Sequence, residues 1–199
     1  MQPRETAALY DAIAHVWSAR TFHSKYGRAY LERAVSLVKG NSRDALDVGC
    51  GGGRLAVQLL AAGFNTTALD ASCEMIREAA KNAPDARLVC ADIAAWEDPN
   101  QYDIVVAWDS TVHLPKQQQI PTLRKLCRLL RPGGVLLFTA LGVEMEVSIE
   151  RDGHAFYYAS VAASTILETL HDEQCQTVLL ERDQFPENHV AVIALRNDA

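Results

Sequence analysis

The chain has 199 residues, of which 49% are hydrophobic, so it fits one domain of ordinary size with a buried core. Its formal net charge of −6 argues against a nucleic-acid partner, because phosphate binding depends on clustered lysines and arginines. No apolar stretch is long enough to cross a membrane and the first residues lack the apolar core of a signal peptide, so we expect a cytoplasmic protein with no membrane partner.

Helical periodicity dominates the first part of the chain. Apolar and aromatic residues recur at spacings of three and four from Thr6 to about Val38, which predicts two helices with a break near residues 21–27. The sequence Lys39-Gly40-Asn41-Ser42 is expected to end the second helix. Residues 1–40 therefore form the predicted N-terminal helices.

Strand and helix patterns alternate from residue 44 to residue 140. We expect strands at 45–48, 66–69, 87–90, 103–107 and 134–140, and helices at 53–62, 72–80 and 116–130. Such alternation is typical of an α/β fold, in which helices cover both faces of a mostly parallel sheet.

The pattern changes after Ala140. Residues 143–158 alternate apolar and polar side chains around an Asp152-Gly153 pair, a strong hairpin signal, so we expect a hairpin or lid at 141–160. A helix at about 162–171 and two strands at 175–181 and 189–195 are expected to complete residues 161–199, the strands as an antiparallel pair at one sheet edge. Nothing divides residues 1–199 into more than one domain.

The cysteines carry no framework signal. They are five in number and scattered, with no C-x-x-C pair, which argues against both a disulfide framework and a structural zinc site. We therefore expect reduced thiols at all five, which are Cys50, Cys73, Cys90, Cys127 and Cys175. No His, Asp or Glu cluster has metal-ligand spacing, so no metal site is predicted, although ligands can converge from distant loops.

The most informative stretch is residues 45–55, where an apolar run stops in four glycines and restarts as a helix. Glycine allows positive φ angles and removes side chains that would hold a ligand away from the backbone, so this turn is expected to carry a nucleotide-like cofactor. Asp70 ends a β-prone run 23 positions after Asp47 (70 minus 47), about where the diol of a ribose would be held.

The residues around the turn favour one nucleotide cofactor over another. A dinucleotide fingerprint requires a glycine where this chain has Arg54. Asp47, two residues before Gly49, would repel a pyrophosphate but suits a ligand that carries an ammonium group and a sulfonium. The ligand predicted is S-adenosylmethionine. A nicotinamide-linked oxidoreductase and a non-catalytic S-adenosylmethionine-binding protein are the alternatives.

Four segments resemble those of a known family. Residues 46–53 resemble motif I of the class I S-adenosylmethionine-dependent methyltransferases, 69–75 the family's acidic loop and following helix, 90–93 its adenine-binding acid, and 130–136 its turn into the fifth strand. The resemblance implies a Rossmann-like, doubly wound, seven-stranded sheet with an antiparallel last strand. It also implies methyl transfer to an O, N or S atom of a small-molecule metabolite, with S-adenosylhomocysteine as product.

The resemblance also implies roles for individual residues. Asp47 would organise the turn and the methionine ammonium group, Asp70 would accept from the ribose hydroxyls, and Asp92 would accept from the adenine amino group. The implied cofactor-binding set is Tyr10, Asp47, Gly49, Cys50, Gly51, Gly53, Asp70, Ala71, Met75, Asp92, Ile93, Ala107 and Trp108. Helix capping is the alternative role of the two later aspartates, and core packing that of Met75 and Tyr10.

Methyl transfer is an in-line displacement, so the protein must align the acceptor and, where necessary, remove its proton. His113 is the candidate general base, because a histidine titrates near neutrality, with a purely structural role as the alternative. Asp109 is expected to orient the acceptor or to hold His113. Trp17, Tyr157 and Tyr158 are expected to line the acceptor site. The polar segment 183–189 is either a further part of that site or an ordinary loop. A monomer and a homodimer remain equally compatible with the sequence.

Overall fold

The computed structural model of the chain describes residues 3–39, 42–151, 153–184 and 188–198. Three details of the sequence interpretation therefore lie outside the described residues. They are the Gly40-Asn41 pair after the second helix, the aspartate of the Asp152-Gly153 turn, and residues 185–187 of the last loop.

The helices and strands follow the predicted order. The helices are α1 (Pro3–Thr21), α2 (Arg28–Leu37), α3 (Arg54–Ala61), α4 (Cys73–Asn82), α5 (Lys116–Leu129) and α6 (Ala163–Asp172), with a 3-10 turn at Thr111–His113 that was not predicted. The strands are β1 (Asp44–Val48), β2 (Asn65–Asp70), β3 (Arg87–Cys90), β4 (Tyr102–Ala107), β5 (Leu130–Ala140), β6 (Met145–Arg151), β7 (His154–Ser160), β8 (Cys175–Asp183) and β9 (His189–Arg196).

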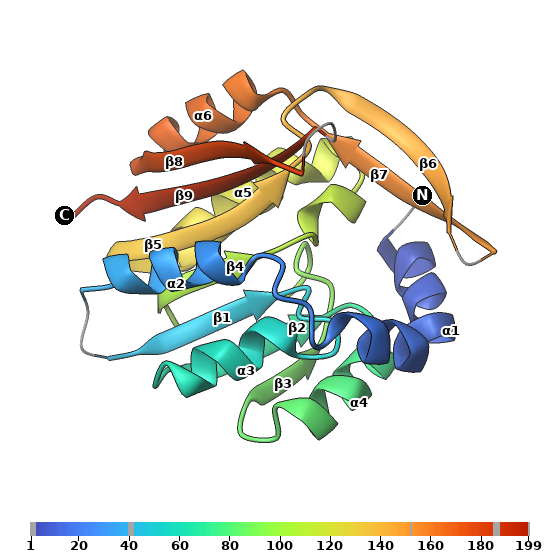
Figure 1. Cartoon of the computed structure of the whole chain (residues 1–199). Coiled ribbons are helices and arrows are strands. Elements are labelled where there is room, and N and C mark those ends of the chain that lie inside the picture. The colour runs from blue at the N-terminus through green and yellow to red at the C-terminus, as the bar shows by residue number, and fades with distance from the viewer. Residues whose placement is uncertain (1–2, 40–41, 152, 185–187, 199) are drawn as a thin grey trace.

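Seven strands form one sheet in the order β3-β2-β1-β4-β5-β9-β8 (Figure 1). The first five are mutually parallel, and β9 runs antiparallel to both β5 and β8. The predicted Rossmann-like sheet with a reversed last strand is confirmed. Strand β5 begins four residues earlier than predicted (134 minus 130), because Leu130 already pairs with Tyr102 before a register shift leads to the pairing of Val135 with Ile104.

Helices cover both faces of the sheet (Figure 1). Leu31 of α2 and Leu59 of α3 pack with Ile104 on one face, and α4 continues this layer beside β2. Leu126 of α5 and Leu170 of α6 pack on the opposite face. Every residue of the central strand β4 is buried, so the strand ends beside it are fixed from both sides.

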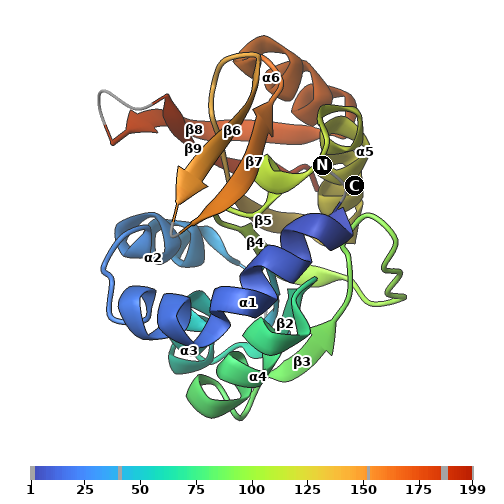
Figure 2. The ribbon, with the colours of Figure 1, turned by 90° about the vertical axis from the view of Figure 1, so that its right-hand side faces the viewer.

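Two further elements lie across the carboxyl ends of the parallel strands, α1 and the β6-β7 hairpin (Figure 2). The hairpin strands pair only with each other among the described strands. Strand β7 is part of the core, because Phe156 is 1% exposed and Tyr157 is buried. Of the predicted hairpin or lid, strand β7 therefore belongs to the core. Only β6 alternates half-buried and exposed side chains, over residues 145–148.

Cys73 and Cys90 form a disulfide, so the expectation of reduced thiols is wrong for these two. The β2-β3 register places Cys90 opposite Asp70. After Asp70 the chain turns directly into α4, so the Cα atoms of Cys73 and Cys90 lie 5.3 Å apart. A separation of 17 residues gives no such signal in the sequence. The other three cysteines are free and buried.

Within the described ranges, no helix combines the length and the apolar composition that crossing a bilayer requires. The same part of the chain holds no group of three or more His, Cys, Asp or Glu side chains placed to bind a metal ion.

Candidate active site

A cavity of about 710 Å³ opens at the carboxyl ends of the parallel strands, and α1 and the hairpin contribute to its wall. Its wall comes from α1, the glycine turn at 49–52, the end of β2, residues 91–93 and 108–114, the inner face of β6, and the start of β9. Ligands of open α/β sheets bind at this edge. The position therefore identifies the cavity as the candidate site.

The cavity collects most of the residues that the sequence predicted for a site. Those that line it are Tyr10, Trp17, Gly49, Cys50, Gly51, Asp70, Ala71, Met75, Asp92, Ile93, Trp108, Asp109, His113 and Tyr158. Those outside its lining are Asp47, Gly53, Ala107 and Tyr157.

Gly49 and Gly51 of the turn are required for different structural reasons. A Cβ built on Gly49 (φ 69°) would lie 2.2 Å from the Cβ of Ser110, so this glycine allows the loop after β4 to approach β1. A Cβ built on Gly51 (φ 53°) would meet no protein atom within 4 Å, and Gly51 lines the cavity. The turn therefore presents bare backbone to a ligand at Gly51 and accommodates a neighbouring loop at Gly49.

Asp70 is held in place by the backbone. The Gly51 N–H donates to its Oδ2 and the Ser72 N–H to its Oδ1, each over 2.8 Å. Burial raises the pKa of Asp70, while these hydrogen bonds oppose that rise. The cap of α4 is Ser72, whose Oγ accepts from the Met75 N–H over 3.1 Å, so capping is not the role of Asp70. Each carboxylate oxygen keeps a further lone pair for a ligand hydroxyl.

Asp92 and Asp47 occupy different settings. Oδ1 of Asp92 accepts from the Ala94 N–H over 2.9 Å in a tight turn, and the residue lines the cavity. Asp47 is buried behind the glycine turn, and its Oδ2 has no hydrogen-bond partner in the described part of the chain. Burial raises the pKa of Asp47 to about 7, although the Arg54 guanidinium opposes this. A direct contact of Asp47 with a ligand stays a prediction.

His113 is engaged at both ring nitrogens. Nδ1 lies 2.9 Å from the Tyr157 carbonyl oxygen and therefore donates to it, which leaves Nε2 to accept from the Tyr10 hydroxyl over 3.0 Å. Burial lowers the pKa of His113, so the ring is neutral at physiological pH. These are the contacts of a residue that joins α1, the 3-10 turn and β7, which favours the structural role over that of a base.

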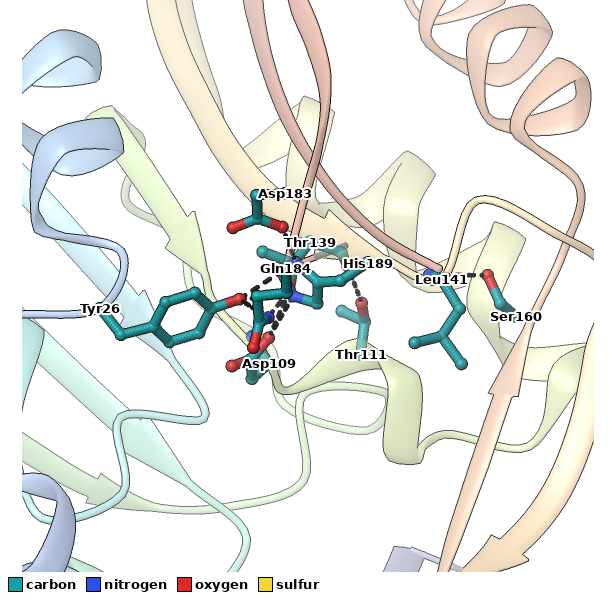
Figure 3. Close-up of polar contacts among 9 residues, drawn as sticks. All are labelled: Tyr26, Asp109, Thr111, Thr139, Leu141, Ser160, Asp183, Gln184 and His189. Carbon is teal, nitrogen blue, oxygen red and sulfur yellow. Dashed lines mark hydrogen bonds and ion pairs between the residues drawn. The ribbon is translucent and has the colours of Figure 1, made fainter. Parts of the chain in front are cut away.

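A second histidine, His189 at the start of β9, lies between two carboxylates (Figure 3). Nε2 donates to Oδ1 of Asp109 over 2.7 Å, and Nδ1 donates to Asp183. The Tyr26 hydroxyl lies 3.0 Å from Nδ1 and in turn accepts from the Gln184 amide. Burial opposes a charged ring, but the hydrogen bonds and charges of the two aspartates raise the pKa of His189 overall.

Asp109 thus holds His189 and makes no hydrogen bond to His113, which corrects one of its two expected roles. Sequence reasoning missed Tyr26 and Arg54 as cavity residues, and it named His189 only as part of the polar segment at 183–189. Contacts between residues as far apart in the sequence as 26 and 189, or 109 and 189, produce no local spacing pattern from which they could be predicted. The only signal was the polar composition of the segment at 183–189.

Comparison with known proteins bears on the family. A family model described as a methyltransferase domain matches residues 45–134, the segment that carries the glycine turn, Asp70 and Asp92. Residues 45–134 therefore form a methyltransferase domain. The match favours methyl transfer over the nicotinamide-linked alternative.

Several named proteins are similar to this methyltransferase. A ubiquinone biosynthesis O-methyltransferase of Pseudomonas savastanoi pv. phaseolicola is 27% identical over 84% of this chain and 72% of the relative. The DhpI-SAH complex has a TM-score of 0.73 at 23% identity, over 99% of this chain and 98% of that one. The 1,6-didemethyltoxoflavin-N1-methyltransferase of Burkholderia thailandensis has a TM-score of 0.68 at 19% identity, over 100% and 92%.

Proposed function

We propose that this methyltransferase uses S-adenosylmethionine to methylate an O, N or S atom of a small molecule. The observation that carries the proposal is a single cavity that extends from the bare backbone of Gly51 and the fixed carboxylate of Asp70 to Asp109 and the rings of Trp17 and Tyr158. The cavity volume of about 710 Å³ is within the range of small-molecule sites.

The residues at the glycine end fit the donor. Gly51 leaves room against the backbone, and Asp70 has lone pairs free for the two ribose hydroxyls. Asp92 would accept from the adenine amino group, and Met75 and Ile93 would provide apolar surface for the adenine ring. Tyr10 and Trp108 close this end from α1 and from the end of β4.

The other end of the cavity suits an acceptor. When bound, S-adenosylmethionine supplies a methyl group on a positively charged sulfur, so the protein needs no acylating nucleophile. The chain's own task is to exclude water, to orient the acceptor among Trp17, Tyr158 and the inner face of β6, and to take a proton where the acceptor carries one. Asp109, which lines the cavity, would take that proton, while Tyr157 lies outside the lining and gives its carbonyl oxygen to His113.

Two measurements test the function. Calorimetry with S-adenosylhomocysteine should show binding, and NAD⁺ should show none under the same conditions. Incubation with methyl-deuterated S-adenosylmethionine and a pooled metabolite extract should yield a protein-dependent product that carries the three deuterium atoms of the methyl group. Binding of NAD⁺ without S-adenosylhomocysteine binding would reject the donor, and donor binding without any labelled product would leave a non-catalytic binding protein as the better account.

A further inference from the structure

We propose that Asp109 is the proton acceptor for an aromatic hydroxyl substrate, and that His189 and Asp183 are positioning residues that fix its carboxylate at the cavity wall. The inference rests on the proposed methyl-transfer function and deepens it.

The carboxylate of Asp109 has one oxygen engaged and one open. Both of its contacts fall on Oδ1, from His189 over 2.7 Å and from the Thr139 hydroxyl over 3.1 Å. No hydrogen bond from a described residue reaches Oδ2. The side chain is 45% exposed and lines the cavity. A general base needs a lone pair within reach of the substrate, and Oδ2 provides one.

The backbone fixes the direction of this side chain. Asp109 has a φ of 52°, a left-handed conformation that aspartate tolerates better than most residues, and its N–H donates to Oγ1 of the buried Thr139 over 2.8 Å. Ser110, the residue after Asp109, packs against Gly49 at the end of β1. Contacts with β5 through Thr139 and with the end of β1 through Ser110 therefore hold this part of the chain.

His189 gives Asp109 a hydrogen-bond donor, and this donor carries a positive charge when the ring is protonated. The His189 ring is buried. Three groups face it, which are Asp109 after β4, Asp183 of β8, and the Tyr26 hydroxyl of the segment between α1 and α2. Arg54 of α3 adds a second positive charge near Asp109. Because the donors from His189 and Thr139 both contact Oδ1, the other oxygen of Asp109 is left free to receive a proton.

The rival base, His113, lacks a free lone pair. Its Nε2 accepts from Tyr10, and its Nδ1 donates to the Tyr157 carbonyl. Breaking the Tyr10 contact to expose Nε2 would give up a part-buried hydrogen bond, which costs about 1 kcal/mol. Of the two, Asp109 has the accessible proton-accepting atom.

The surroundings indicate the substrate class. The rings of Trp17, Tyr158 and His113 and the apolar side chains of Met145 and Val147 line the cavity, and Val147 pairs across the hairpin with Tyr158. Such a wall favours a flat aromatic ring, because stacked and edge-to-face ring contacts add to apolar burial. A hydroxyl on that ring would meet the open oxygen of Asp109.

In the methyl transfer, the hydroxyl oxygen forms a bond to the methyl carbon, the carbon–sulfur bond breaks, and its electron pair stays on sulfur. The hydroxyl proton moves to Oδ2 of Asp109, which loses it to solvent after the product leaves.

The test uses catechol and 4-nitrocatechol as acceptors, because the second ionises near neutral pH without help. Asp109→Asn should lower kcat on catechol about 100-fold. It should cost far less on 4-nitrocatechol and leave the affinity for S-adenosylhomocysteine unchanged. Glu150→Gln removes a carboxylate that is exposed on β6 outside the cavity lining, and it should change neither rate.

His189→Gln tests the positioning role, because glutamine can still donate to Asp109 but carries no charge. The acid limb of the catechol kcat/KM profile should move to higher pH by about 1 unit or more. A purely structural role would lower stability without moving that limb. This variant decides alone if Asp109→Asn loses affinity for S-adenosylhomocysteine.

Three results would overturn the inference. They are equal losses on both acceptors in Asp109→Asn, an unmoved acid limb in His189→Gln, and a wild-type protein that binds S-adenosylhomocysteine yet methylates neither acceptor. The last would reject the aromatic hydroxyl class and leave the proposed function standing. Absence of S-adenosylhomocysteine binding would reject the proposed function itself.

Discussion

The hydroxyl of Tyr10 lies 3.0 Å from Nε2 of His113, and this contact joins the first helix to the turn that follows β4. The Tyr10 ring also meets those of Trp17 and Phe156, edge-on and tilted respectively. Burial raises the pKa of the Tyr10 hydroxyl, so it remains a donor at every physiological pH. The contact therefore holds α1 over the cavity in one arrangement.

Tyr10→Phe should destabilise the fold by about 1 kcal/mol, because it removes this hydrogen bond and keeps the ring contacts. Urea unfolding measures this loss, and an unchanged unfolding free energy would contradict it.

His113→Ala should reduce turnover and the affinity for S-adenosylhomocysteine in parallel, as expected for a residue that joins α1 to β7 at the cavity wall. Turnover assays and calorimetry measure the two effects. A loss of turnover in His113→Ala with unchanged affinity would instead assign His113 the role of base.

Acidification should destabilise the protein through His113. Burial lowers its pKa below the ordinary value of 6.5, so between the folded value and 6.5 the unfolded chain binds more protons than the native one. The contribution of His113 to the unfolding free energy therefore falls as the pH drops below about 6.5. Urea unfolding from pH 7.5 to 5 should show a shallower decline for His113→Gln than for wild type. Parallel curves would contradict the buried neutral ring.

The glycine turn offers a matched pair of variants. Gly49→Ala and Gly51→Ala each place a methyl group at a positive φ, a strain of about 1 kcal/mol in both. At position 51 the Cβ has open space in the cavity wall, so the affinity for S-adenosylhomocysteine should fall at least tenfold with little further loss of stability. At position 49 the Cβ collides with Ser110, so thermal stability should fall further. Equal effects of the two variants on affinity and stability would reject this division.

Asp70→Ala should weaken S-adenosylhomocysteine binding by about 2 kcal/mol, in line with the loss of a charge-assisted hydrogen bond. The variant also frees the N–H groups of Gly51 and Ser72, so Asp70→Asn, which keeps one acceptor oxygen, is the companion that separates turn disruption from lost ribose contacts. Calorimetry at one pH measures both. Unchanged affinity in both variants would remove Asp70 from the ribose site.

Local spacing made the strand, glycine turn and helix around Gly49 predictable, because each part is recorded in neighbouring residues. Asp70 was predictable for the same reason, as the last residue of the next strand. The hairpin was found through its alternation, but its role was not. Phe156 and the Tyr157 carbonyl tie β7 to the core and to His113, so removing residues 143–158 would damage the fold as well as the acceptor site.

The network around His189 could not be predicted, because its members come from four separate parts of the chain. Tyr26 and His189 are 163 residues apart, and Asp109 and His189 are 80 apart. They meet only because β9 inserts between β5 and β8, which brings its first residue to the carboxyl end of β5. Sequence reasoning could name the polar segment at 183–189 but not its partner.

The disulfide between Cys73 and Cys90 should stabilise the protein by about 3 kcal/mol through the loop that it closes. It joins the start of α4 to the end of β3, next to Asp70 and Asp92, both of which line the cavity. Reduction, or the double variant Cys73→Ser with Cys90→Ser, should therefore lower the urea midpoint. It should also weaken S-adenosylhomocysteine binding, because the turn at 70–73 is then held by hydrogen bonds alone.

The double variant also serves as the control for the reductant. Dithiothreitol should lower the stability of the wild type to that of the double variant and should not affect the double variant, because the remaining thiols at positions 50, 127 and 175 are free and buried. Mass spectrometry after alkylation under unfolding, non-reducing conditions should find three reactive thiols in the wild type, and five after reduction. Five reactive thiols before reduction would show that the bridge does not form in the purified protein.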